Sequence, residues 1–232
     1  MSNYFEFNGH KSSEYGLVVN GVNIFNAPSR VVNKINIPYR NGDLLIDTGV
    51  YSNIMVSYNI GLTDPTRIPD ITGWLLNTSG YATLKDTWHS GEYRMASYYN
   101  DLNYQMSMLY RYGEATISFD CKPQRYLTSG DTTYTISTST TLSNPTAFAS
   151  SPKISVTGNG TFTVNGYSVT VTDNASDSIT IDCERMQCYR GTTNMNASVT
   201  LASGFPQLKT GNNSCGKGTV STLTIQPKWW RL

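Results

Sequence analysis

The sequence predicts a mainly β protein built from two modules. Three observations predict it: apolar and polar residues alternate along many short segments, turn residues separate these segments, and only one segment has helical spacing. The length of 232 residues fits one large β domain or two modules of roughly 100 residues each. Residues 119–154 contain a Ser/Thr-rich run with prolines and divide the chain into unlike halves. We therefore expect an N-terminal β-sandwich or barrel-like domain with one short helix, followed by a C-terminal antiparallel β-sandwich.

The first half opens with short strands. We expect them at residues 4–7, 15–19 and 30–37, and Pro38 ends the third because it has no N–H to donate to a neighbouring strand. The sequence Asn41-Gly42-Asp43 then predicts a turn that tolerates positive φ. Residues 54–60 give the clearest strand of this half, because every second residue is apolar.

One helix is expected at about residues 70–80. Ile71, Trp74 and Leu75 have the i, i+3, i+4 spacing of an apolar helix face. Asp70 precedes them as the expected N-cap, and Gly80 suits the C-terminal side. Further strands are expected at residues 81–85, 93–99, 103–110 and 115–121.

The second half has stronger strand and turn signals. Residues 162–171 form the clearest hairpin, with two alternating runs about an Asn-Gly turn. Residues 133–139 are expected to be the first strand of the second domain, which places the boundary at residues 128–131 and the domains at 1–129 and 130–232. We expect a protease to cut first at residues 128–131. The other expected strands are 153–156, 178–183, 187–189, 195–201 and 219–225.

Composition excludes some classes of protein. The formal net charge is +1 and only 14% of residues are charged, so the chain lacks the broad positive field that nucleic-acid binding needs. Sixteen tyrosines and many Asn, Ser and Thr residues suit large polar contact surfaces, and also sugar binding. No secretion signal follows Met1 and no run of 18 apolar residues occurs, so we expect synthesis in a cytoplasm and no membrane insertion.

The sequence offers no catalytic constellation. His10 and His89 lie far apart in polar, turn-like settings, and His89 is expected at an exposed loop tip. No serine lies in a nucleophile elbow and no helix carries a zinc-binding histidine pair. Because the acidic residues are scattered, no pair stands out for glycoside hydrolysis. We expect a protein that is not an enzyme and that uses no cofactor or metal.

The four cysteines are expected to be reduced, buried thiols. They lie in apolar or Gly-rich strand contexts, and none of their spacings is that of a zinc site. A disulfide between Cys183 and Cys188 is the alternative, and it needs an oxidising compartment. The four are Cys121, Cys183, Cys188 and Cys215.

Residues 211–218 nearly spell a phosphate-binding P-loop. Gly218 stands where that motif needs a hydroxyl for Mg²⁺, and Thr219 comes one position late. A P-loop must also open a helix, whereas an alternating strand follows here. We interpret residues 211–218 as a Gly/Asn-rich hairpin connection.

Trp229 and Trp230 are the only ligand-binding candidates. One interpretation places one ring in the core and the other over a sheet edge or a neighbour. The other interpretation makes the pair a platform on which a sugar stacks. Adjacent residues of a strand point to opposite faces, so the structural interpretation is favoured.

Several stretches, in the same order, resemble the distal tail protein (Dit) family of long-tailed, non-contractile bacteriophages. The set covers nearly the whole chain, and Lys228 stands where the family favours arginine. The stretches are SSEYGLVVNG, IPYRNGDLLIDTGVYSNIMVSYNIGL, ITGWLLNTSGYATLKDTWHSGEYRMASY, GEATISFDCKPQRYL, NPTAFASSPKISVTGNG, FPQLKTGNNS and LTIQPKWWRL.

The resemblance implies a homohexameric ring at the tail tip of a virion, assembled in the host cytoplasm. The N-terminal domains would surround a channel through which DNA passes without specific binding, and C-terminal galectin-like sandwiches would project outward. The implied partners are the tail tube protein, the tail-associated baseplate protein and, in some relatives, a receptor-binding protein. The alternative function is a carbohydrate-binding module that recognises host surface polysaccharide.

Overall fold

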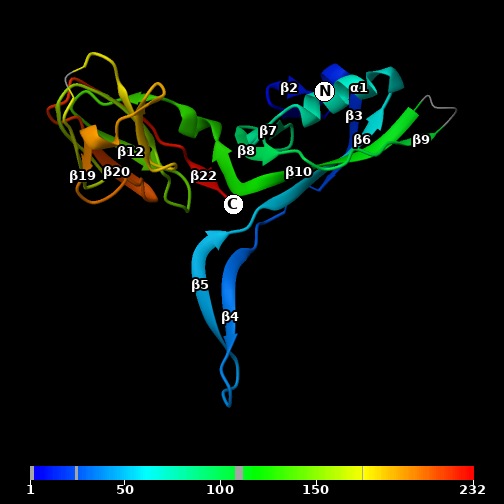
Figure 1. Ribbon diagram of the computed structural model, residues 1–232, viewed down its shortest axis with the longest axis horizontal. Helices are drawn as coiled ribbons and strands as arrows, with labels where there is room; N and C mark the ends of the chain where they lie inside the picture. Colours follow the sequence, from blue (N-terminus) through cyan, green and yellow to red (C-terminus); the bar gives the residue numbers. More distant parts are fainter. Residues whose placement is uncertain (1–2, 24–25, 108–111, 174) are drawn as a thin grey trace. The chain divides into compact units, whose positions relative to one another are not determined.

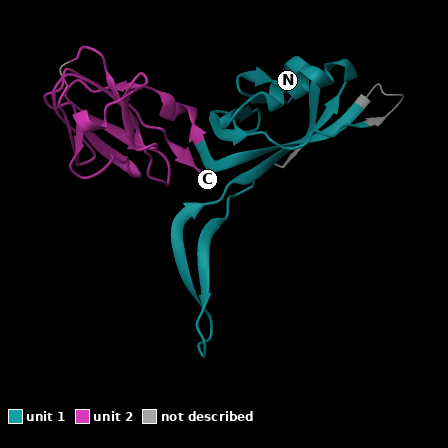
Figure 2. Ribbon diagram, viewed as in Figure 1, with its two compact units in different colours: residues 1–125, 232 teal, residues 126–231 magenta. Residues whose placement is uncertain are grey.

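The computed structural model describes residues 3–23, 26–107, 112–173 and 175–232 (Figure 1). The chain divides into two compact units: residues 1–125 with residue 232, and residues 126–231 (Figure 2). This division falls a few residues before the expected boundary at 129 and 130. Strands dominate both units, which confirms the mainly β class. The described residues contain one α-helix, α1 (Ile68–Leu76), and no described helix is long and apolar enough to cross a membrane.

Unit 1 is built on one large sheet. Its strands follow the spatial order β2-β1-β7-β8-β10-β6-β3, and β9 pairs with the start of β10. The strand expected at 103–110 is present in part, and its residues 108–110 lie outside the described ones. The strands are β1 (Phe5–Phe7), β2 (His10–Lys11), β3 (Leu17–Asn23), β6 (Ile54–Leu62), β7 (Ala82–Asp86), β8 (Glu92–Ser97), β9 (Gln105–Ser107) and β10 (Tyr112–Leu127), joined in part by the 3-10 helices η1 (Ser12–Tyr15) and η2 (Pro65–Arg67).

The sheet of unit 1 curls around its own core. Phe5 on β1 and Tyr58 on β6 stack with their ring centroids 4.6 Å apart, although three strands lie between β1 and β6. Neighbouring strands are spaced by about 4.8 Å, so a flat sheet would hold β1 and β6 roughly 19 Å apart. The curvature gives the barrel-like form expected for this half, and α1 adds Ile71, Trp74 and Leu75 to the same core.

The helix begins earlier than the sequence suggests. Asp70 lies in the first turn of α1 and is not its N-cap, because Pro69 occupies the start of the helix. Proline suits that position, since its fixed φ is helical and the N–H it lacks would have no helical partner. Trp74 then fixes the helix to the sheet by donating its indole N–H to the carbonyl oxygen of Phe7 at 3.0 Å.

Two strands of unit 1, β4 (Arg30–Asn36) and β5 (Asp43–Tyr51), pair only with each other and leave the curled sheet as a ribbon (Figure 1). The expected turn joins them, and Gly42 has φ 83° there. The strand at 43–51 is not predicted from the sequence. Its Leu44-Leu45-Ile46 run is continuous and lacks the period-two pattern that marks a half-buried strand.

Unit 2 is an antiparallel β-sandwich, as predicted. One sheet has the order β11-β21-β13-β16-β17-β18, the other has the order β12-β20-β14-β15-β19, and both contribute to one core. The strands are β11 (Tyr134–Thr135), β12 (Ser139–Asn144), β13 (Lys153–Thr157), β14 (Gly160–Val164), β15 (Tyr167–Val171), β16 (Ile179–Asp182), β17 (Gln187–Arg190), β18 (Thr193–Asn194), β19 (Val199–Leu201), β20 (Gly211–Gly216), β21 (Thr222–Gln226) and β22 (Trp230–Arg231), with 3-10 helices η3 (Thr128–Asp131) and η4 (Asn196–Ser198).

Two expectations for unit 2 are wrong. Residues 211–216 are strand β20, between β12 and β14, and only the residues after Gly216 form the turn. Residues 196–198 form η4, so the strand expected at 195–201 begins at Val199. The hairpin of β14 and β15 is confirmed: Asn165 has φ 48° and Gly166 has φ 83°, as a two-residue turn with positive φ requires.

The stretch at residues 128–131 is a packed turn. Gly130 is buried, and its carbonyl oxygen accepts a hydrogen bond from the backbone N–H of Lys228 at 2.8 Å. The Lys228 ammonium lies 2.6 Å from the Asp131 carboxylate. A protease needs an extended, accessible segment, so this packing argues against the first cut expected there.

Candidate functional site

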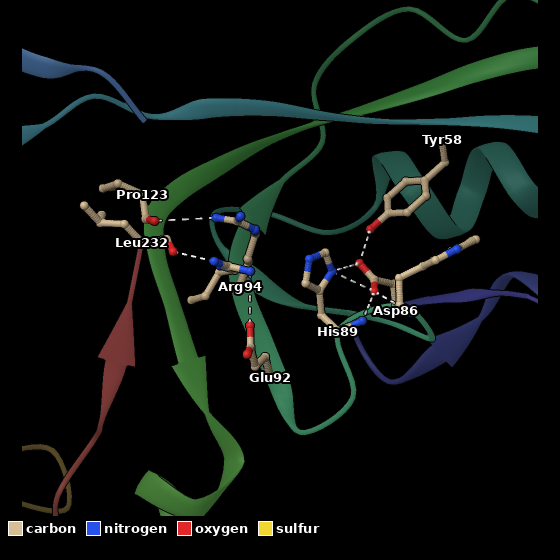
Figure 3. Close-up of polar contacts among 9 residues, drawn as sticks. Tyr58, Asp86, His89, Glu92, Arg94, Pro123 and Leu232 are labelled. Atoms are coloured by element: carbon tan, nitrogen blue, oxygen red, sulfur yellow. Dashed lines mark hydrogen bonds and ion pairs between the residues drawn. The ribbon is translucent and has the colours of Figure 1, made fainter. Parts of the chain in front are cut away.

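The most concentrated polar chemistry in unit 1 surrounds Asp86, at the end of β7 (Figure 3). Its carboxylate accepts a hydrogen bond from the Tyr58 hydroxyl at 3.1 Å and lies 3.0 Å from Nδ1 of His89. It also accepts from the backbone N–H groups of Trp88 at 2.9 Å and His89 at 2.8 Å. The His89 side chain is only 12% exposed, so the expectation of an exposed loop tip is wrong.

A second set of charged groups adjoins this cluster. The Arg125 guanidinium lies 3.4 Å from the Glu92 carboxylate and donates to the carbonyl oxygen of Leu232 (Figure 3). Arg94 is buried, and its guanidinium lies 3.5 Å from the carbonyl oxygen of Pro123. Burial lowers the pKa of Arg94. Burial, with the neighbouring Asp86 carboxylate, raises the pKa of Tyr58 well above its usual value.

This polar cluster is a structural network. The cavity at its centre has a volume of about 10 Å³, which is about enough for one water molecule and leaves no room for a substrate. Asp86 closes the connection between β7 and β8 by accepting two backbone N–H groups, and Tyr58 ties that connection to β6. His10, the other histidine, lies elsewhere, 3.6 Å from Glu14.

All four cysteines are buried and free, which confirms the expectation of reduced, buried thiols and excludes a Cys183–Cys188 disulfide in this structure. Burial raises the pKa of Cys121 to about 12 and that of Cys215 to about 11. A thiol must be ionised to attack or to bind metal, so these are poor nucleophiles and ligands at neutral pH. Among the described residues, no group of three or more His, Cys, Asp or Glu side chains is placed to hold a metal ion.

The two C-terminal tryptophans have different environments. Trp229 is buried in the core of the sandwich. Trp230 is half-buried, stacks on Phe148 with a 4.6 Å centroid separation, and donates its indole N–H to the carbonyl oxygen of Ala149 at 3.0 Å. The two rings therefore do not form one flat platform.

The ribbon of β4 and β5 is the most unusual surface of the described chain, because apolar side chains project from it into solvent. Tyr39 at the tip is fully exposed, and Leu45 and Val50 are more than half exposed, at 57% and 55%. The remaining exposed apolar residues on the ribbon are Val31, Ile35, Leu44 and Ile46.

These side chains occupy both faces of the ribbon. Ile35 is directly opposite Leu44, while Leu45 is opposite Lys34 on the other face. At the base, Arg30 bonds to Asp47 and donates to the Tyr51 hydroxyl at 3.0 Å, which fixes the two strands to each other. An isolated two-stranded hairpin is only marginally stable in water, so burying the apolar side chains of the ribbon against another surface would stabilise it.

Sequence reasoning does not identify the ribbon as a site, because Ile, Leu and Val ordinarily indicate core. The available signal is the Leu44-Leu45-Ile46 run directly after an Asn-Gly turn, since three consecutive apolar residues cannot all face one core from a strand. The expected candidates lie in unit 2, and the exposed apolar surface lies in unit 1.

Comparison with known proteins relates the chain to phage tails. Residues 128–229 match the family model of the siphovirus-type tail component, C-terminal domain. The crystal structure of the Dit protein of phage SPP1 is similar over 100% of both chains, with a TM-score of 0.69 and 13% identity. It is described as a paradigm of the hub adsorption apparatus in phages that infect Gram-positive bacteria. A search of curated proteins finds no match.

Two baseplate structures share the fold as well. A chain of the phage P2 baseplate in its activated conformation with Ca has a TM-score of 0.54 and 10% identity, over 97% of this chain and 98% of the other. A chain of the p2 baseplate with Sr has a TM-score of 0.54 and 9% identity, over 100% and 99%. The family model thus identifies residues 128–229 as a siphovirus-type tail component domain, and the fold of the whole chain is shared with the SPP1 Dit protein and with the two baseplate chains.

Proposed function

We propose that the chain forms a homohexameric ring at the tail tip, surrounds the DNA channel, and joins the tail tube to the tail-associated baseplate protein. The shared fold supports this, because the SPP1 protein with that fold is described as a hub of the adsorption apparatus. The role is mechanical and needs no enzyme activity or cofactor. Synthesis and assembly take place in the host cytoplasm, and the finished ring is part of the virion.

The ribbon of β4 and β5 is the observation that carries the proposal. Fully burying a Val, Leu, Ile or Phe-sized side chain stabilises an association by about 1.5–3 kcal/mol. The ribbon exposes six aliphatic side chains of this kind and one tyrosine, none of which packs in the core of unit 1. Such an apolar surface marks a protein–protein contact, and in a ring every copy can cover the ribbon of its neighbour.

The low charge of the chain suits a channel that DNA crosses without being held. A protein that binds DNA tightly neutralises many phosphates with Lys and Arg, whereas this chain has a formal net charge of +1. The carbohydrate-binding alternative gains no comparable support. Its two candidate rings have structural environments, Trp229 in the core and Trp230 stacked on Phe148.

Size-exclusion chromatography with light scattering tests the ring. We expect a mass of six times the 25.7 kDa chain mass, and ring-shaped particles in negative-stain images. The double variant Ile35→Lys, Leu44→Glu keeps a complementary cross-strand pair on the hairpin but removes two exposed apolar groups, so we expect it to dissociate the hexamer.

Leu76→Lys is the matched control, because Leu76 is 53% exposed at the end of α1, outside the ribbon. We expect this control to keep the hexamer. A wild-type chain that is monomeric at every concentration, or a ribbon variant as hexameric as the control, would overturn the proposal. Binding of purified cell-wall polysaccharide that is lost in Trp230→Ala, with folding intact, would favour the carbohydrate-binding alternative instead.

A further inference from the structure

The tip of the ribbon carries an aromatic ring and an unmatched positive charge. Tyr39 is fully exposed and has φ 63°, a left-handed backbone conformation that bulky residues rarely adopt. Arg40 beside it is also exposed. Among the described residues, no carboxylate forms an ion pair with Arg40. Tyr and Arg are the side chains most often found at energetically dominant positions of protein interfaces.

A polar groove of about 500 Å³ lies on the face of the unit 1 sheet opposite the core. Two carboxylates, Asp101 and Glu114, line it, and in the described part of the chain neither forms an ion pair with a cationic side chain. The rest of its polar wall consists of the hydroxyl of Thr116 on β10 and four amide side chains: Asn20 from β3, Asn59 from β6, Asn103, and Gln105 from β9.

We infer that the tip of one ribbon docks in this groove on the next copy of the chain, with Arg40 between Asp101 and Glu114 of the partner copy. The inference rests on the proposed ring and adds the pair of surfaces that specifies the neighbour. An arginine fork matches the geometry of carboxylates and amide oxygens, and the groove volume accommodates both tip side chains. Arg40 is opposite in charge to Asp101 and Glu114, and none of the three has an ion-pair partner within its own described chain.

A second copy is the occupant that these surfaces favour. The tip lies at the far end of the ribbon from the strands that line the groove (Figure 1). Tip and groove are different surfaces of one chain, so the same contact repeated from each copy to the next gives a head-to-tail arrangement. Head-to-tail contacts between identical chains produce a closed ring when the rotation closes. In this arrangement the ribbon tip of the neighbouring subunit fills the groove of each copy.

Charge reversal tests the docking. We expect Arg40→Glu, and separately Asp101→Lys with Glu114→Lys, to weaken subunit association at least about ten-fold in sedimentation equilibrium. Combining all three substitutions should restore association to within about three-fold of wild type, because the attraction is re-formed with the signs exchanged. Lys209→Glu, an exposed cation in unit 2, is the control of equal charge change and should have no effect. The docking is overturned if Arg40→Glu associates as tightly as this control, or if the combined variant associates more weakly than both of its parent variants.

Cross-linking separates this inference from the ring itself. The native thiols are buried, so Arg40→Cys combined with Asn103→Cys adds the only accessible pair among the described residues. Mild oxidation should then give a ladder of linked chains that ends at the hexamer on a non-reducing gel. The pair Arg40→Cys, Lys209→Cys is the control. If light scattering shows a hexamer but the Arg40→Cys, Asn103→Cys pair forms no more cross-links than this control, the docking is refuted and the ring is retained. A monomer at all concentrations would refute both.

Discussion

Replacing Asp86 by alanine should destabilise unit 1 by about 3–5 kcal/mol. The substitution removes the acceptor of the Tyr58 hydroxyl, which is completely buried, and an orphaned buried donor costs about 1–3 kcal/mol. It also removes the acceptor of the Trp88 and His89 backbone N–H groups. Those two groups are partly buried, and each such bond contributes about 0.5–1.5 kcal/mol net.

Tyr58→Phe separates the hydroxyl contribution from the rest. It removes one donor and leaves the two backbone bonds and the His89 contact of Asp86 in place, so we expect a loss of about 0.5–1.5 kcal/mol. Asp86→Asn should lie between the two variants, because its amide oxygen can still accept the backbone N–H groups.

Urea unfolding, followed by hydrogen exchange in β6 and β7, measures these losses for unit 1 separately from unit 2. The two units need separate probes, because a chain with two cores can unfold in more than one step. If Asp86→Ala costs less than about 1 kcal/mol, or no more than Tyr58→Phe, the hydrogen bonds that Asp86 accepts do not stabilise unit 1.

Three further predictions concern the tip, the junction and the thiols. In the monomer obtained by dilution, trypsin should cut first after Arg40 at the exposed tip, and mass spectrometry that finds a first cut at residues 128–131 would contradict the packed turn. Gly130→Ala should lower the melting temperature of unit 2, because the new Cβ would lie 2.3 Å from the backbone nitrogen of Trp229; an unchanged transition would refute this. Burial raises the pKa of Cys121 to about 12, so the contribution of this thiol to stability is full below the ordinary thiol pKa and is lost as pH rises through the folded value. The free energy of unfolding measured in urea should therefore fall above about pH 9. Because all four thiols are buried, a thiol reagent should modify no cysteine in the native protein at pH 8.

Period-two patterns predict a strand correctly where one of its faces is exposed to solvent and the other is buried. Strand β6 alternates strictly between buried and more exposed residues. The hairpin of β14 and β15 has an Asn-Gly turn whose positive φ values few other residues adopt. These signals are local, so the sequence alone specifies them. The curling of the unit 1 sheet is not local: it depends on Phe5 meeting Tyr58 across three intervening strands.

Strand β20 shows how side-chain chemistry can hide a strand. Its Gly-Asn-Asn-Ser sequence is typical of a loop, yet Asn213 is completely buried. The Asn213 amide donates to the carbonyl oxygens of Leu142, Lys209 and Gly211, and its side-chain oxygen accepts the Lys209 N–H. A buried amide with its hydrogen bonds satisfied is compatible with a core, but the partners become known only in three dimensions.

The exposed apolar ribbon limits which assemblies can be soluble. In the proposed head-to-tail arrangement each copy offers one ribbon and one receiving surface, so every open chain of copies leaves one ribbon uncovered. Closure is the step that covers the last ribbon, and it removes apolar surface without ordering another subunit. Intermediate oligomers should therefore be scarce, and dilution should convert rings directly into monomers. A mass distribution dominated by a stable dimer would show instead that the ribbon is covered within each pair, which requires a two-fold contact and excludes the ring.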